Sequence, residues 1–181
     1  MNEKTIIEFL FNENTERASQ KFLFKYIWKK NFTELKKSII YAVIFLTVGF
    51  LPLKGFDKNA VPYIFKYIGF LYIGYIFLLI YLYKYSKKKT DKIIEETIKD
   101  FKNSNDQTVR IILKENSFEI TNVFNVFGSI WEKTSYKFVG DYLIVQMLED
   151  RLSFIFTKRE FNNSDYDILI KYLQKYSKQK K

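Results

Sequence analysis

The 181-residue sequence contains no cysteine and no histidine, and it has only two prolines and six glycines. Without cysteine, the chain forms no disulfide and offers no thiolate as nucleophile or metal ligand. Without histidine, it lacks the usual general base and the commonest metal-binding side chain. The glycines are too scattered to form a phosphate-binding loop. An enzyme could still use carboxylates and lysine as its catalytic residues, but the sequence shows no cluster of them. We therefore expect that the protein is not an enzyme and binds no metal or cofactor.

Two long apolar runs dominate the first half of the chain. Ile39–Leu53 carries no charge, and Tyr63–Tyr85 is interrupted only by Lys66 and Lys84. Both runs are apolar on every side, which is typical of helices buried in a bilayer or in a large core. A chain of this length has no core large enough to surround two such helices. The sequence therefore predicts a two-helix transmembrane hairpin over residues 38–85.

Length keeps a pair of core helices open as the alternative. A membrane span needs roughly 20 apolar residues, and the first run is about 15 residues long. It reaches the required length if Lys36 and Lys37 extend their ammonium groups to the lipid headgroups. Gly49, Gly69 and Gly74 are expected to let the two helices approach closely.

The charges around the hairpin predict its orientation. Residues 25–37 and 84–92 each carry five basic residues and one acidic residue, a net of +4, whereas the connecting loop at 54–61 carries +1. Basic residues favour the cytoplasmic side, so both termini are expected in the cytosol. Pro52 and Pro62 bracket the loop. The juxtamembrane basic residues are Lys29, Lys30, Lys36, Lys37, Lys87, Lys88 and Lys89.

The same charges account for the net charge of +10, which by itself would suggest a nucleic-acid partner. Residues 93–181 hold 14 basic and 13 acidic residues, a net of only +1. The surplus therefore flanks the membrane, where it favours anionic lipid headgroups. We expect the lipid bilayer as a partner and no nucleic acid. We also expect no cleavable signal peptide, because the first apolar run begins only at residue 39.

Outside the hairpin, the apolar pattern divides the chain into further elements. Thr5–Phe11 is rich in β-favouring residues and predicts a short strand, which would be free to join a sheet as an edge strand. Residues 15–31, with Asn14 as N-cap, predict an amphipathic helix that lies either on the membrane surface or on a cytosolic domain. A charged stalk helix follows the second run to Lys102. The expected segments are 1–37 (strand and amphipathic helix), 38–85 (hairpin), 86–104 (stalk and linker) and 105–181 (cytosolic β domain).

From Gln107 the apolar period changes to two, which is typical of strands. Strands are expected at 108–114, 118–123, 124–131, 136–139, 142–148 and 151–157. Gly140 and Asp141 predict a type II′ hairpin turn, and Ser164–Asp167 predicts the cap of a C-terminal helix. The expected fold class is an α+β membrane protein, with an antiparallel β domain closed by that helix.

Three features of this region resemble the YcxB-like family of bacterial membrane proteins. They are the strand–turn–strand Ile112–Phe118, the following Trp131, and the segment Phe156–Phe161 before the terminal helix. Thr157 stands where the family often has proline, whereas Lys158, Arg159 and Phe161 fit its pattern. The resemblance implies a carboxy-terminal domain related to pleckstrin-homology folds and a place in the bacterial cytoplasmic membrane. It implies no established reaction.

The sequence offers three candidate binding residues. Lys158 and Arg159 either bind an acidic partner or form a solvated loop, since exposed basic residues are common. Trp131 is either a ligand contact or, as we favour, a core residue. The function expected is a non-enzymatic, membrane-anchored binding module on the cytosolic face, with self-protection against a membrane-active peptide or toxin as one version. The alternative is an auxiliary subunit of a transporter or secretion complex. The oligomeric state stays open.

Overall fold

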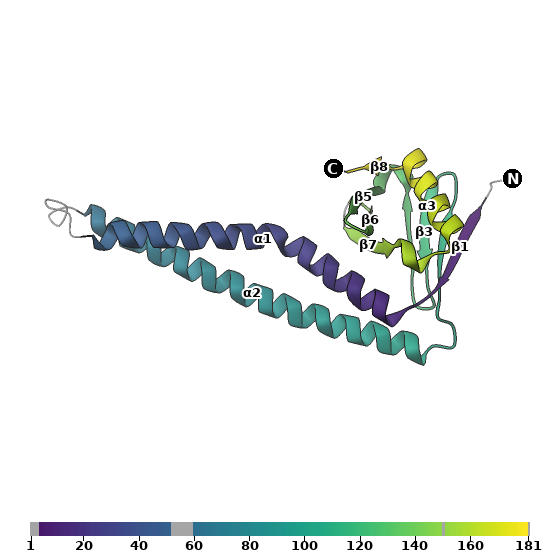
Figure 1. Cartoon of the computed structure of the whole chain (residues 1–181), viewed down its shortest axis with the longest axis horizontal. Coiled ribbons are helices and arrows are strands. Elements are labelled where there is room, and N and C mark those ends of the chain that lie inside the picture. Colours follow the sequence, from purple (N-terminus) through teal and green to yellow (C-terminus); the bar gives the residue numbers. More distant parts are fainter. Residues whose placement is uncertain (1–3, 52–59, 150, 181) are drawn as a thin grey trace. The chain divides into compact units, whose positions relative to one another are not determined.

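The structure is a computed structural model that describes residues 4–51, 60–149 and 151–180. In this part of the chain it contains three α-helices and two β-sheets, one antiparallel and one mixed, an α+β architecture (Figure 1). The chain divides into two compact units. The first, here called the β unit, comprises the chain up to Leu23 and from Ile93 onward. The second, the helical unit, is Phe24–Lys92.

The first sheet of the β unit combines the amino-terminal strand with three strands from the second half of the chain. Its order is β1-β2-β3-β4, and every neighbouring pair is antiparallel. Strand β1 pairs with β2 from Thr5↔Leu113 to Leu10↔Thr108, so the amino-terminal strand does join the sheet as an edge strand. The bounds are β1 Thr5–Leu10, β2 Thr108–Leu113, β3 Ser117–Thr121 and β4 Val126–Ile130.

The pairing of β1 with β2 makes both long helices an insertion between two neighbouring strands. Beyond the last strand pair, the backbone N–H of Phe11 donates to the carbonyl of Gln107 at 2.8 Å. Residues 12–106 therefore leave the sheet and return to it at the same place. The ring of Phe11 also stacks on Phe101, with the ring centroids 4.1 Å apart.

The second sheet has the order β7-β6-β5-β8. Gly140 begins the two-residue turn between β5 and β6 with φ +59°, the value that a type II′ turn requires at this position. Strand β8 runs parallel to β5, because the chain returns to this sheet after the last helix. The bounds are β5 Ser135–Val139, β6 Tyr142–Met147, β7 Leu152–Thr157 and β8 Lys178–Gln179.

Helix α3 (Asn163–Tyr176) closes the β unit. Its Leu169 and Leu173 are fully buried in a cluster that draws residues from both sheets. Its N-cap is Asn162, two residues before the predicted capping segment at Ser164. The cluster contains Ile7, Ile111, Leu113, Phe118, Ile120, Trp131, Tyr136, Leu143, Val145, Met147, Phe156, Phe161, Leu169 and Leu173.

Each of the two long helices is continuous. Helix α1 (Glu13–Phe50) joins the predicted amphipathic helix to the first apolar run, since no glycine or proline interrupts residues 13–48. Its cap is Asn12 rather than Asn14, because the Asn12 side-chain oxygen accepts the N–H of Thr15 at 3.0 Å. Helix α2 (Val61–Asn103) continues from the second apolar run through the charged stalk, as predicted.

Two of the predicted glycines bring the helices of the helical unit together. A Cβ atom added at Gly69 would lie 2.6 Å from the Leu46 side chain, and one added at Gly49 would lie 3.0 Å from the backbone nitrogen of Lys66. Glycine is therefore required for this close approach. The expectation does not extend to Gly74, where an added Cβ would meet no atom within 4 Å.

In the described part of the chain, one helix is long and apolar enough to cross a membrane, by length and composition. This helix is α2, and only 11% of its most apolar stretch is buried within the protein. The apolar part of α1, residues 38–50, is 13 residues long and follows Lys36 and Lys37. Most of the predicted loop lies at 52–59, outside the described residues.

Candidate functional site

An open cleft of about 900 Å³ on the β unit is the candidate site. Three segments form its walls: the first turns of α1, the β5–β6 turn, and the segment that joins β7 to α3. Its lining residues are Asn14, Thr15, Ala18, Ser19, Phe138, Gly140, Asp141, Tyr142, Thr157, Lys158, Arg159, Phe161 and Tyr166. Because α1 follows β1 directly, its first turns lie next to the β5–β6 turn and the β7–α3 segment.

The α1 wall is one face of a helix. Its lining residues form two pairs four positions apart, Asn14 with Ala18 and Thr15 with Ser19, so they share a side of α1. Ser19 is 1% exposed, and its hydroxyl has no hydrogen-bond partner among the described residues. Buried hydroxyls normally have a partner, so this one is left unsatisfied within the described part of the chain. One turn further along, Phe22 stacks on Tyr142 at 4.0 Å between ring centroids and holds α1 against the hairpin.

Two cations stand at the rim of the cleft. Lys158 and Arg159 belong to the short 3-10 helix η2 (Lys158–Glu160) and are exposed. Neither has an ion-pair partner in the described ranges. The N–H of Thr157 donates to Glu160 Oε2 at 3.2 Å, which fixes the start of η2. Phe161 is buried after it, so the two cations stand on an anchored segment.

Two carboxyl groups next to the cleft have raised pKa values. Burial is the main cause at Glu160, where it raises the pKa to about 7, and the nearby charge of Glu16 adds to the effect. Burial also raises the pKa of Glu16, although a hydrogen bond from Gln20 at 3.0 Å opposes it. Ionised carboxylates are costly in such surroundings unless they are paired. Both carboxyl groups therefore release their protons at a higher pH than an exposed glutamate does.

Aromatic rings complete the cleft. Phe138 is 45% exposed, and Tyr142 and Tyr166 also line the cleft. Tyr166 packs against Phe161 at 5.7 Å between ring centroids. Asp141 is the one acidic residue among the lining residues. The site thus offers cations at the rim, a buried hydroxyl and an aromatic surface.

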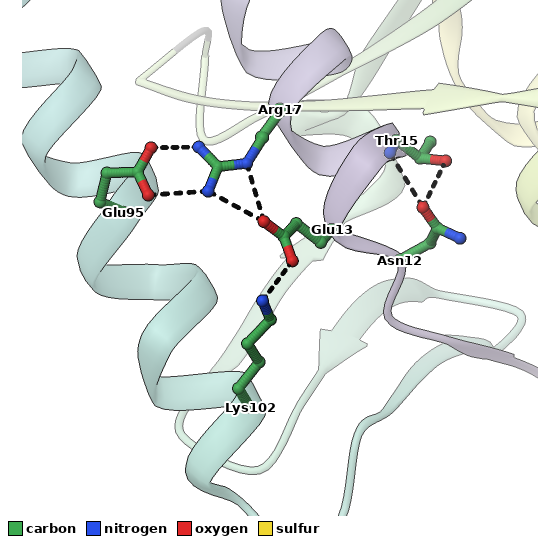
Figure 2. A network of polar contacts seen from close by, with 6 residues as sticks. All are labelled: Asn12, Glu13, Thr15, Arg17, Glu95 and Lys102. Atoms are coloured by element: carbon green, nitrogen blue, oxygen red, sulfur yellow. Dashed lines mark hydrogen bonds and ion pairs between the residues drawn. The ribbon is translucent and has the colours of Figure 1, made fainter.

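Within the β unit, a polar network joins the first turns of α1 to the last turns of α2 (Figure 2). Arg17 donates to Glu95 on α2 through both terminal nitrogens and to Glu13 through Nε, the latter at 3.0 Å. Lys102 Nζ lies 2.5 Å from Glu13 Oε2. Hydrogen bonds from Lys102 and Arg17 lower the pKa of Glu13, and the bond from Arg17 lowers that of Glu95. The network therefore holds the start of α1, which forms a wall of the cleft, against the end of α2.

The three predicted site residues do not come together. Lys158 and Arg159 line the cleft, whereas Trp131 lies in the core, 4% exposed. The Trp131 indole N–H donates to the carbonyl of Lys114 at 2.9 Å, and its ring stacks on Tyr176. Its burial and its hydrogen bond are those of a packing residue, the reading favoured from the sequence.

The predicted juxtamembrane lysines lie on the helical unit and are exposed. Lys29, Lys30, Lys36 and Lys37 belong to α1, and Lys87, Lys88 and Lys89 belong to α2. Among the described residues, no group of three or more histidine, cysteine, aspartate or glutamate side chains is placed to hold a metal ion.

Sequence reasoning missed Ser19 and Tyr142. No local pattern marks them, because their role depends on the packing of α1 against the β5–β6 turn, far away in the sequence. Comparison with known proteins does not supply a role either: no family model, curated protein or solved structure matches the chain.

Proposed function

We propose that the protein is a non-enzymatic binding module anchored to the cytosolic face of a bacterial cytoplasmic membrane. The observation that carries the binding role is the cleft, whose lining includes Lys158, Arg159 and Ser19. Among the described residues, the two cations have no ion-pair partner and the buried Ser19 hydroxyl has no hydrogen-bond partner. These groups are suited to holding a ligand. Self-protection against a membrane-active peptide or toxin is the version of this role that fits a small anchored module.

The β1–β2 pairing supports a two-span anchor. Paired strands lie on the same side of a membrane, so the chain between Leu10 and Thr108 must cross the bilayer an even number of times. If α2 crosses once, α1 has to make the second crossing. The short apolar part of α1 suffices if Lys36 and Lys37 extend to the headgroups and residues beyond Phe50 add length.

The side chains of α2 also favour a lipid environment over a protein core. Tyr67, Leu71 and Phe77 are 72%, 73% and 67% exposed, although a core helix would bury such residues. Exposed apolar surface of this extent marks a contact with a membrane or another protein. The net charge of +4 at each cytosolic end supports the inside–inside orientation.

The strand order supports a pleckstrin-homology-like fold for the β unit. Seven antiparallel strands in two sheets are followed by one closing helix, with the helical hairpin inserted after the first strand. This order agrees with the resemblance to the YcxB-like family, which we retain as a proposal.

Photo-crosslinking in bacterial cells tests the binding role. A benzoylphenylalanine in place of Phe138, which is half exposed on the cleft wall, should form an adduct with whatever occupies the cleft. The adduct should disappear when Lys158→Glu and Arg159→Glu are added. It should persist with Lys171→Glu and Lys178→Glu, two exposed lysines outside the cleft lining that give the same change in charge.

The mass of the adduct separates the versions of the proposal. A peptide or toxin adduct supports self-protection, a transporter or secretion subunit supports the auxiliary role, and a small mass shift indicates a lipid or metabolite. If no adduct depends on Lys158 and Arg159, the cleft is not a binding site and the proposal is wrong.

A further inference from the structure

The charges of the cleft favour an anion. Among the lining residues, Lys158 and Arg159 outnumber Asp141, and the two cations have no ion-pair partner in the described part of the chain. Glu16 and Glu160 are not lining residues, and burial raises the pKa of both carboxyls, which reduces their negative charge. The first turn of α1, with Asn14 and Thr15, faces the same space.

An independent observation points to a ligand. Ser19 lines the cleft from α1, is 1% exposed, and has a hydroxyl without a partner among the described residues. An unsatisfied buried hydroxyl costs free energy unless a ligand or water supplies the missing hydrogen bond. It is a donor suited to an anionic oxygen, and it lies on α1, whereas the two cations lie on η2.

The size of the cleft and its aromatic surface exclude a bare anion as the natural occupant. A volume of about 900 Å³ lies in the range of small-molecule sites, which is roughly 300–1,000 Å³. Phe138, Tyr142 and Tyr166 offer surface for an apolar or planar body. The ligand therefore combines an anionic group with such a body.

We infer that the cleft binds a phosphate ester with an apolar or aromatic body. The phosphate accepts from Lys158 and Arg159 at the rim and from Ser19 on α1, and the body packs on the aromatic side chains. A tetrahedral phosphate presents oxygens in several directions, so it reaches donors on two walls more readily than a planar carboxylate. This inference rests on the proposed binding function and names the chemistry of its ligand.

Two sources supply this chemistry, a phospholipid headgroup or a soluble phosphorylated metabolite, and titration calorimetry distinguishes them. The full-length protein in neutral maltoside micelles is titrated with inorganic phosphate, adenosine monophosphate and dihexanoylphosphatidylglycerol. At least one ester should bind tenfold or more tightly than inorganic phosphate, because only the esters bring a body to the aromatic surface. Tighter binding of the nucleotide indicates a soluble ligand, and tighter binding of the lipid indicates a headgroup.

Three variants test the geometry. Lys158→Glu with Arg159→Glu should weaken the better ester at least tenfold, whereas Lys171→Glu with Lys178→Glu should change its affinity less than twofold. Ser19→Ala should weaken binding about three- to tenfold and leave the thermal midpoint unchanged or raised, since the hydroxyl has no partner to lose. Ala18→Trp, at an exposed position of the α1 wall, should fill the cleft and block the ester.

The inference is overturned if neither ester binds more tightly than inorganic phosphate, or if both charge-reversed double variants weaken binding equally. It is also overturned if Ser19→Ala leaves the affinity unchanged. The outcome for the proposed function is separate. Should the cleft-dependent adduct at position 138 prove to be a protein while the esters fail to bind, the binding module stands and its ligand is not a phosphate ester.

Discussion

Glu160 lies where the β7 strand meets the cleft, and its protonation matters for stability. Its pKa is raised from the ordinary 4.5 to about 7, chiefly by burial. The folded β unit therefore binds a proton that the unfolded chain releases between these two pH values. Stability is highest when the carboxyl is protonated in both states, falls as the pH rises from about 4.5 to about 7, and then levels off.

Glu160→Gln should remove much of this pH dependence. The amide oxygen still accepts the N–H of Thr157, and no charge has to be buried beside Glu16. We expect the variant to be more stable than the natural protein at pH 8 by about 2 kcal/mol, and equally stable near pH 4.5. Thermal midpoints of the full chain in neutral detergent at pH 4.5–8 measure this.

Glu132→Gln, at an exposed position of the same unit, is the control and should leave the profile unchanged. If Glu160→Gln has the same dependence of thermal midpoint on pH as the natural protein, the loss of stability above pH 4.5 does not come from ionising Glu160.

At the scale of single residues, the sequence predicted features that depend only on neighbouring residues in the chain, such as a turn. Gly140 was correctly placed at the first position of a hairpin turn, since few other residues adopt its positive φ. The α1 cap was placed at Asn14 instead of Asn12 because both asparagines precede the helical pattern, and only the hydrogen bond to Thr15 separates them. Ser19 could not be recognised, because its burial comes from distant parts of the chain.

Strand β1 is the element on which the insertion depends, and its two faces differ sharply. Ile7 is 1% exposed in the core cluster, whereas Leu10 is 74% exposed. Ile7→Ala should lower the free energy of unfolding of the β unit by roughly 2–4 kcal/mol, because it leaves a cavity between packed side chains. Leu10→Ala is the matched control and should change it by less than about 0.5 kcal/mol.

Denaturant unfolding of the full chain in detergent, followed by circular dichroism in the near ultraviolet, measures both variants. Equal effects of Ile7→Ala and Leu10→Ala would contradict the docking of β1 on β2.

The glycines of α2 make a second comparison between matched positions. Gly69→Val should destabilise the helix pair by roughly 1–3 kcal/mol, because the new side chain overlaps Leu46 on α1. Gly74→Val adds the same atoms where no neighbour lies within 4 Å and should be tolerated. Resistance to unfolding in increasing dodecyl sulfate measures the difference. If both valine variants unfold alike, α1 and α2 do not pack through Gly69.

The elements were predicted well where one period persists. The alternation in residues 108–114 predicted β2 within a residue at each end, because one side of that strand is buried. The prediction at 142–148 matches β6 equally well, although Leu143, Ile144 and Val145 bury both sides of it. The continuity of α1 was missed because the change from an amphipathic to an apolar pattern at Ser38 was taken for a boundary. Composition changes there, but no residue breaks the helix.

For the whole molecule, the sequence predicted β1 to β7 and the closing helix but not β8, and it left open whether Thr5–Phe11 joins the sheet and so makes residues 12–106 an insertion. That arrangement follows from pairing between residues about a hundred positions apart, such as Glu8 with Arg110, whose side chains form an ion pair at 2.7 Å. It makes the cleft possible, since it brings the first turns of α1 to the β5–β6 turn. It also couples the two units along one helix, because α1 runs without a break from the cleft wall into the helical unit.

The insertion leads to a strict prediction about membrane topology. Because β1 pairs with β2, the two termini must lie on the same side of the bilayer. Given the basic clusters at 25–37 and 84–92, that side should be the cytosol. A reporter enzyme that is active only outside the cytoplasm should therefore work when inserted at Asn59 and stay inactive at either terminus.

Activity at both termini would reverse the orientation but keep the hairpin, and opposite results at the two termini would contradict the β1–β2 pairing itself. Inactivity at all three positions, in a protein that still fractionates with membranes, would mean that neither helix crosses the bilayer.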